Sequence, residues 1–209
     1  MKKLKQRKSS IEEYHKGESM AHYFTNENIE SNITETKCII NDIELTLLTD
    51  NGVFSKRGLD YGTRTLLESL PHIEGSVLDI GCGYGPIGIY LAKLGASVDM
   101  CDINRRALKL AKDNIKLNNV EANVFESDIY SNVSKKYNYI ISNPPIRVGN
   151  EILYKMLFEA KEYMQENGHL IIVVNKDQGA KTMMKKLESV YKVSLLNKNK
   201  GFFVIDCQI

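Results

Sequence analysis

Long apolar runs are absent from the sequence, and none approaches the roughly eighteen residues that a membrane span requires. The N-terminal residues MKKLKQRK are not followed by the apolar core of a secretory signal. The four cysteines form no CxxC pair, and the four histidines form no HxxxH pair, so we expect neither a disulfide framework nor a zinc site. These absences favour a cytoplasmic protein with no metal and no membrane partner.

A strong excess of one charge is also absent. The chain has 28 basic and 26 acidic residues, a net charge of +2, so it is not the polycation that a non-specific nucleic-acid binder tends to be. Basic residues do cluster locally in residues 1–20 and 181–200. The simplest interpretation of such clusters is solvated lysine. Apolar residues at 43% and charged residues at 26% are ordinary values for a soluble globular protein.

Three segments follow one another along the chain. Residues 1–21 lack apolar periodicity and are predicted to be a flexible basic tail. Residues 36–49 contain two β-rich runs around Asn41-Asp42, a pair that tolerates the positive φ of a hairpin turn. We therefore predict a β-hairpin appendage and a substrate-side loop over residues 22–60, and a single catalytic domain over residues 61–209.

From Ser76 onward, short apolar strands alternate with amphipathic helices, which is typical of a doubly wound, mainly parallel α/β sheet. The predicted strands cover residues 76–80, 97–102, about 122–127, 137–142 and 169–175. The predicted helices cover residues 85–95, 104–119 with Asn104 as N-cap, about 151–164 with Gly168 past its end, and 180–189. A closing hairpin over residues 193–207 leaves one strand antiparallel.

A glycine-rich turn, VLDIGCGYGPIG, joins the first of these strands to its helix. Gly81, Gly83 and Gly85 let the backbone turn sharply, so that a ligand can lie against bare main chain at a helix N-terminus. Dinucleotide-binding folds begin in the same way, and the turn alone does not decide between cofactors.

Two aspartates stand at the ends of the following strands. Asp102 is about twenty residues downstream of the glycine turn, where a carboxylate accepts hydrogen bonds from two ribose hydroxyls. Asp128 ends the third strand, where it is placed either to accept a hydrogen bond from an adenine amino group or to lie in a solvated loop. Both nicotinamide-binding and adenosylmethionine-binding folds use the group at Asp102.

The turn Asn143-Pro144-Pro145 at the end of the fourth strand separates these alternatives. In sheets of this class the first and fourth strands flank the switch point, so we expect Asn143 to share a crevice with the cofactor's reactive end. An aromatic exocyclic amine is a poor nucleophile because its lone pair is delocalised. If Asn143 Oδ1 and the Pro144 carbonyl each accept one N–H, the lone pair points at a sulfonium methyl, and catalysis consists mostly of positioning and desolvation.

Residues 22–209 resemble the small-domain family of class I methyltransferases, and within it the single-domain relatives of the ribosomal RNA guanine-N2 methyltransferase C. The segments that carry the resemblance are Gly52-Val53-Phe54-Ser55, Leu59-Asp60-Tyr61-Gly62, VLDIGCGYGPIG, Asp102 and NPPIRVG. The resemblance implies a seven-stranded Rossmann-like sheet in the order 3-2-1-4-5-7-6 with strand 7 antiparallel. It also implies S-adenosyl-L-methionine as cofactor and the guanine 2-amino group of RNA, in ribosomal RNA or the small ribosomal subunit, as acceptor.

Roles for single residues follow from the same resemblance. Asp79 and the three glycines of the turn would hold the methionine end, with Gly62 and Thr63 closing over it, while Asp102 holds ribose and Asp128 holds adenine. The further cofactor contacts implied are Cys82, Ile103 and Ile129, and Asn143 also adjoins the cofactor. Asn143 and Pro144 would bind the target amine, in the turn completed by Pro145.

The acceptor side departs from the family pattern in one place. Ile146 stands where many relatives have an aromatic residue that stacks on the flipped base, so Phe54 is the candidate for stacking. Arg147 follows directly and is interpreted either as a partner of a phosphate beside the extruded nucleotide or as a surface ion-pair residue.

Three other hypotheses remain open at this point. A nicotinamide-dependent oxidoreductase fits the glycines and Asp102, but it leaves the Asn-Pro-Pro turn without a role. The same turn also serves methylation of DNA adenine or of protein glutamine. A non-catalytic RNA-binding scaffold would keep the fold without the activity. The sequence leaves open whether the protein is a monomer or a homodimer.

Overall fold

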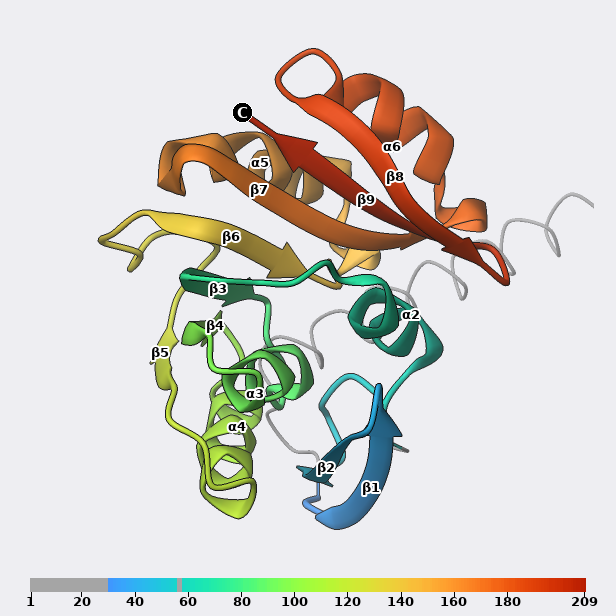
Figure 1. The fold of residues 1–209 in the computed structure, drawn as a ribbon. Coiled ribbons are helices and arrows are strands. Elements are labelled where there is room, and N and C mark those ends of the chain that lie inside the picture. Colours follow the sequence, from blue (N-terminus) through green and yellow to red (C-terminus); the bar gives the residue numbers. More distant parts are fainter. Residues whose placement is uncertain (1–29, 56–57) are drawn as a thin grey trace, which may run out of the picture.

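Seven strands form the main sheet of the computed structural model, in the order β5-β4-β3-β6-β7-β9-β8 (Figure 1). Their bounds are β3 Ser76–Ile80, β4 Ser97–Asp102, β5 Asn123–Glu126, β6 Tyr137–Ser142, β7 Met164–Asn175, β8 Lys192–Asn199 and β9 Phe202–Gln208. Strands β5, β4, β3, β6 and β7 pair in parallel, while β9 is antiparallel to both of its neighbours. Counted from β3 onward this is the order 3-2-1-4-5-7-6, which confirms the predicted topology.

The structure describes residues 30–55 and 58–209. The predicted basic tail, residues 1–21, lies outside the described residues. So does the side chain of Arg147, of which only the backbone is placed, within the short helix η1 (Ile146–Val148).

Helices cover both faces of the sheet (Figure 1). Their bounds are α2 Tyr61–Ser69, α3 Pro86–Lys93, α4 Arg105–Leu117, α5 Asn150–Glu159 and α6 Ala180–Leu187, with short 3-10 turns η2 Ala160–Tyr163 and η3 Lys176–Gln178. Neighbouring residues of one strand point to opposite faces, so Val77 joins the core under α2, α3 and α4 whereas Leu78 joins the core under α5 and α6. Burial on both faces explains why the central strands are almost continuously apolar.

A hairpin of two strands precedes the main sheet, formed by β1 (Thr34–Ile40) and β2 (Ile43–Thr49). Its turn residues Asn41 and Asp42 have φ of 45° and 66°, as the sequence pair predicts. Leu45 and Leu47 of β2 are fully buried. Their burial in the core under α2, α3 and α4 ties the hairpin to the main sheet.

Two asparagines of α4 complete the hydrogen bonding of β2. Asn114 accepts a hydrogen bond from Leu48 N at 2.6 Å and donates to the carbonyls of Leu48 at 3.0 Å and Tyr84 at 2.9 Å. Asn118 repeats the pattern one helical turn later, accepting from Thr46 N and donating to Thr46 O. The two side chains therefore make the hydrogen bonds that a neighbouring strand would make along the open edge of β2.

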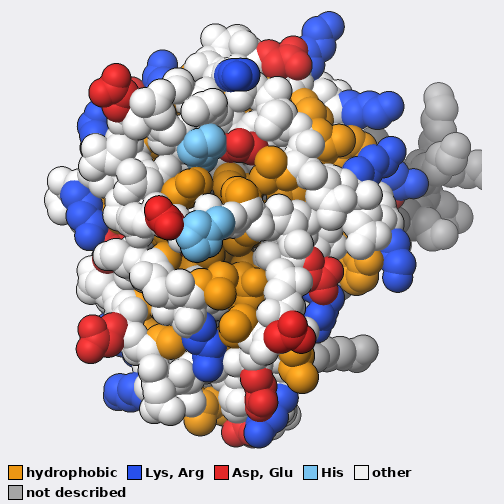
Figure 2. Space-filling view, in the orientation of Figure 1, with side chains coloured by type: hydrophobic (Ala, Val, Ile, Leu, Met, Phe, Trp, Pro, Cys, Tyr) orange, Lys and Arg blue, Asp and Glu red, His pale blue; other side chains and the backbone are white. Residues whose placement is uncertain are grey.

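The closing hairpin carries β9 back beside the end of β7. Its turn lies at Lys200 and Gly201, with φ of 43° and 87°, and Lys176 N donates to Gly201 O at 2.7 Å. The ammonium of Lys200 lies 5.0 Å from the centre of the Tyr61 ring. Figure 2 shows basic side chains gathered on the edge of the molecule where this hairpin turns. Register then places Phe202 opposite Asn175.

The helix predicted over residues 151–164 is wrong at its end. Helix α5 ends at Glu159, and β7 begins at Met164, five residues before the predicted strand, because Met164 is buried and pairs with Tyr137 of β6. Gly168 is therefore not a helix terminator but a residue inside β7. A Cβ there would lie 2.9 Å from the carbonyl oxygen of Gln165, so only glycine fits the local bend of the strand.

The asparagine contacts with β2 predict a loss of stability on substitution. Asn114→Ala removes the side-chain partner of three backbone groups, of which Tyr84 O is buried and the two of Leu48 are part-buried, and is expected to lower the free energy of unfolding by roughly 2 to 4 kcal/mol. Denaturant unfolding followed by circular dichroism measures the change. Asn150→Ala, at the exposed first residue of α5, is the matched control and should leave stability nearly unchanged. Equal midpoints for the two variants would contradict this role of Asn114.

Candidate active site

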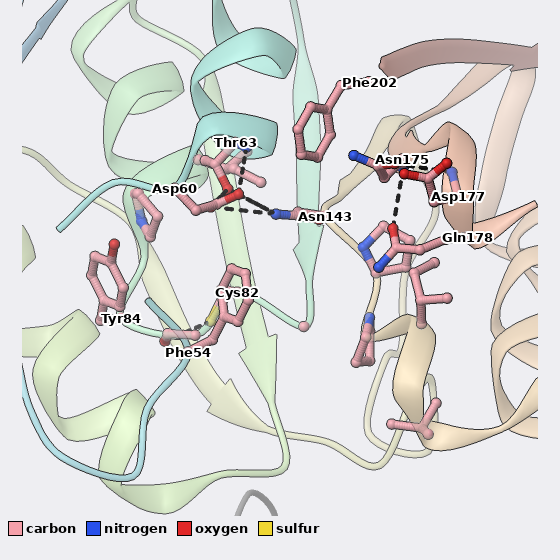
Figure 3. Close-up of a pocket in the computed structure, with 18 residues that line it drawn as sticks. Phe54, Asp60, Thr63, Cys82, Tyr84, Asn143, Asn175, Asp177, Gln178 and Phe202 are labelled. Carbon is pink, nitrogen blue, oxygen red and sulfur yellow. Dashed lines mark hydrogen bonds between the residues drawn. The ribbon is translucent and has the colours of Figure 1, made fainter. Parts of the chain in front are cut away.

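The carboxyl ends of β3, β6 and β7 open onto a cavity of about 620 Å³ (Figure 3). Parallel strands present these ends at one edge of the sheet, where α/β folds bind ligands. Four parts of the chain line the cavity: the glycine turn after β3, the proline turn after β6, Phe54 with the start of α2, and the end of β7 with the start of β9.

The glycine turn presents bare main chain to the cavity. Gly81 and Gly83 line it with φ of 69° and 58°, and a Cβ on Gly83 would meet no atom within 4 Å. Cys82 lines the cavity between them, and α3 begins just beyond, at Pro86. Gly85 does not line the cavity. It packs inward, where a Cβ would lie 3.2 Å from Met100 Sδ.

Asp102 holds the glycine turn from behind. Its carboxylate accepts hydrogen bonds from Gly83 N and Asn104 N, both at 2.8 Å. Burial raises the pKa of Asp102, and the N–H donors of Asn104 and Gly83 oppose that rise. A carboxylate offers about four acceptor positions, so it retains capacity for hydroxyl donors from a ligand. Asp102 is not among the cavity-lining residues, but its partner Gly83 is.

Asp79 lies beneath the same turn and is fully buried. One carboxylate oxygen accepts a hydrogen bond from Gly88 N at 2.9 Å, and the other has no partner among the described residues. Burial raises the pKa of Asp79 to about 8, and the nearby carboxylate of Asp102 adds to the effect. Its observed contact therefore fixes the first turn of α3, and it does not line the cavity.

The residues predicted beside adenine lie farther along the sheet edge. Asp128 and Ile129 follow β5, and Ile103 follows β4 with 38% of its surface exposed. Ser127 N donates to Asp102 O at 3.0 Å, which joins the two strand ends. Ile129 has φ of 50°, unusual for a β-branched residue, and such conformations gather at ligand sites. None of these three residues lines the cavity.

Asn143 reaches the cavity from the end of β6, together with Pro144 and Pro145. Its side-chain nitrogen donates to Thr63 Oγ1 at 3.0 Å and lies 3.3 and 3.4 Å from the two carboxylate oxygens of Asp60 (Figure 3). The structure thus brings the proline turn and the glycine turn into one cavity. Thr63 is buried and lines it, whereas Gly62 is buried beside it and packs against the Phe202 ring.

The remaining wall is formed by aromatic, aliphatic and amide side chains. Phe54, the candidate for stacking, is 48% exposed and lines the cavity, and so does Ile146, the substrate-side residue that follows the proline turn. Phe202 and Asn175 line it from β9 and β7, and Asp177 and Gln178 follow in η3. None of these four residues was predicted from the sequence. Asn175 had a signal, because it is the first polar residue after a buried strand, whereas Phe202 is placed only by the return of β9.

The part of the chain that the structure describes contains no group of three or more histidine, cysteine, aspartate or glutamate side chains able to hold a metal ion. Within the same residues, no helix combines the length and the apolarity needed to span a membrane.

Sequence comparisons find relatives along most of the chain. A Bacillus subtilis (strain 168) protein described as uncharacterized protein YbxB is 36% identical over 193 residues, 88% of this chain and 96% of that protein. The ribosomal RNA small subunit methyltransferase C of Aeromonas hydrophila is 42% identical over 145 residues, 66% of this chain but only 42% of that enzyme. The chain therefore spans less than half the length of this second relative.

A solved structure with the same fold is the T. thermophilus 16S rRNA N2 G1207 methyltransferase in complex with AdoMet and guanosine. The TM-score is 0.78 over 86% of this chain and 51% of that one, at 23% identity. The methyltransferase small domain family matches residues 44–206, which include the hairpin strand β2, the whole cavity and nearly all of the main sheet. The chain therefore belongs to the methyltransferase small domain family.

Proposed function

We propose that the chain transfers the methyl group of S-adenosylmethionine to the exocyclic N2 amine of a guanine in ribosomal RNA. The observation that carries the proposal is the shared cavity, in which a bare glycine turn faces the Asn143-Pro144-Pro145 turn. One turn suits a nucleoside cofactor and the other suits an aromatic amine. The family assignment argues against a nicotinamide-dependent oxidoreductase.

The residues around the glycine turn fit this cofactor. Gly81 and Gly83 leave space against the main chain, and Asp102 keeps acceptor capacity for ribose hydroxyls. Asp79 supports this turn from beneath, because its buried carboxyl group accepts a hydrogen bond from Gly88 N in the first turn of α3. When bound, S-adenosylmethionine supplies a methyl group on a sulfonium that is already activated.

The proline turn fits an aromatic amine. Asn143 Oδ1 and the Pro144 carbonyl are two acceptors on consecutive residues, and proline brings no competing N–H. Two N–H bonds hold the amine so that its lone pair points toward the methyl donor, which requires positioning more than a general base. The flanking Phe54, Ile146 and Phe202 provide an apolar wall for a flat base.

Two observations support ribosomal RNA as the carrier of that base. One group of relatives, which includes the Aeromonas hydrophila protein, is named ribosomal RNA small subunit methyltransferase C, although the chain spans only part of each. Lys200 lies in the turn of the β8–β9 hairpin, two residues before the cavity-lining Phe202, with its ammonium group over the ring of Tyr61. A cation this close in the chain to a cavity-lining residue suits a phosphate beside an extruded nucleotide.

The acceptor is tested directly by methyl transfer. Purified protein with labelled S-adenosylmethionine should methylate ribosomal RNA taken from cells that lack it, and digestion of the product should yield N2-methylguanosine. Adenine and bulk protein are the matched alternative acceptors. Label recovered as N6-methyladenosine or methylglutamine would replace the guanine assignment, and no label in any acceptor would favour a scaffold.

Asn143→Ala should lower turnover by roughly a hundredfold or more, because it removes one of two acceptors that hold the amine. Affinity for adenosylhomocysteine should change little, because the glycine turn and Asp102 remain in place. Single-turnover kinetics and calorimetry measure the two quantities. Asn150→Ala is the control of the same type away from the cavity. Normal turnover in Asn143→Ala would remove this residue from the mechanism.

Asp102→Ala should show the opposite pattern. Loss of charged hydrogen bonds to ribose is expected to weaken adenosylhomocysteine binding by roughly tenfold to a hundredfold. Turnover at saturating cofactor should fall less than in Asn143→Ala. Asp113→Ala on α4 is the control, since Asp113 lies away from the cavity. Unchanged affinity in Asp102→Ala would mean that the nucleoside binds elsewhere.

A further inference from the structure

Asp60 stands where the chain enters α2, and its carboxylate collects donors from three residues. Oδ1 accepts hydrogen bonds from Gly62 N at 2.9 Å and Thr63 N at 3.1 Å, the N-cap contacts of the helix. Oδ2 accepts the hydroxyl hydrogen of Thr63. The third residue is Asn143, whose side-chain nitrogen lies within 3.4 Å of both oxygens.

This contact joins parts of the chain that are far apart in sequence. Asp60 and Asn143 are 83 residues apart, and Thr63 and Asn143 are 80 residues apart. Figure 3 shows Asp60 and Thr63 meeting the nitrogen of Asn143 from one side, with the cavity wall of Phe202 and Asn175 on the other side. Asp60, Thr63 and Asn143 all line the cavity.

The chemistry of the partners decides which way the Asn143 amide faces. An ionised carboxylate has only acceptors. The hydroxyl hydrogen of Thr63 is committed to Asp60, so the Thr63 oxygen offers Asn143 a lone pair. Both neighbours therefore require the NH2 group of Asn143, and a reversed amide would place Oδ1 against oxygen atoms. Oδ1 must consequently point away from Asp60.

We propose that Asp60, acting with Thr63, is a positioning residue that locks the Asn143 amide with Oδ1 turned toward the acceptor amine. This inference rests on the proposed function, in which Asn143 Oδ1 binds that amine. Without the contacts to Asp60 and Thr63, the Asn143 amide is free to turn its NH2 group toward the substrate. Two N–H donors would then face each other, and Oδ1 could not accept the hydrogen bond of the amine.

The charge of Asp60 adds to the effect of orientation. During transfer the N–C bond forms from the amine lone pair, the C–S bond breaks with its electron pair going to sulfur, and the surplus proton on nitrogen passes to water. Positive charge thus moves from sulfur to the amine nitrogen. A carboxylate behind the Asn143 amide polarises it and strengthens Oδ1 as an acceptor for the amine as that charge develops.

Asp60→Asn separates this role from helix capping, because asparagine is an N-cap about as good as aspartate. The new carboxamide removes the charge and puts a donor beside Asn143, so turnover should fall by roughly tenfold to a hundredfold. Affinity for adenosylhomocysteine and the melting temperature should stay close to the wild-type values. Asp113→Asn is the control for the same change of charge.

Two further variants distinguish positioning from a general structural role. Thr63→Val should also lower turnover, and Thr63→Ser, which restores the hydroxyl, should recover most of the loss. Adding Asp60→Asn to Asn143→Ala should cost less than about twofold more, because no amide is left to orient. Unchanged turnover in Asp60→Asn, or the full additional loss in the double variant, would overturn the inference.

A measurement without turnover keeps this inference distinct from the proposed function. NMR of the side-chain amides should show slow hydrogen exchange for the NH2 group of Asn143 in the wild-type protein and faster exchange in Asp60→Asn. Equal exchange in the two proteins would overturn the lock. If the wild type transferred no methyl to any acceptor while this difference held, the proposed function would fail and the amide orientation would stand.

Discussion

The parallel pairing of β3 with β6 is the constraint on which the site depends. Val77, Leu78 and Asp79 pair with Tyr139, Ile140 and Ile141, so both strands end at the same level of the sheet. Ser142 Oγ then donates to Ile80 O at 2.7 Å, across the last residues of the two strands. The two turns that follow these strands therefore face each other. In the proposed function, a nucleoside held by one turn and an amine held by the other are brought together by this backbone register.

Packing behind the glycine turn makes that register rigid. A Cβ on Gly88 would lie 2.3 Å from Met100 Sδ, so α3 can approach β4 this closely only with glycine at this position. Gly81 N and Cys82 N both donate to Cys101 O, which fixes the turn to the end of β4. Asn114 extends the same support outward, since it binds Tyr84 O on one side and β2 on the other. The hairpin is thus part of the scaffold of the turn, which fits a family match that includes β2.

Local patterns in the sequence were sufficient for the strands, the hairpin turn and the glycine and proline turns, because each is specified by residues within a few positions of one another. Asn104 as N-cap and the positive φ at Asn41 and Asp42 are of this kind. The end of α5 was not predictable in this way, because β7 begins where Met164 meets Tyr137. Phe202 and the contact of Asp60 with Asn143 likewise depend on how distant segments come together. Contacts between distant segments cannot be predicted from composition or from the spacing of residues.

Different groups in the cavity are suited to different parts of an acceptor molecule. In the proposed function, two acceptors on the Asn143-Pro144 turn hold an amine, but they cannot distinguish guanine from adenine or from a glutamine side chain, since each presents an NH2 group. Discrimination must therefore come from groups that contact the rest of the acceptor. Phe54 and Phe202 offer faces for a ring, and Asn175, Asp177 and Gln178 offer donors and acceptors for its edge. Because Ile146 beside the proline turn is aliphatic, the proposed function assigns recognition of the acceptor mainly to the ends of β7 and β9, which the closing hairpin brings together.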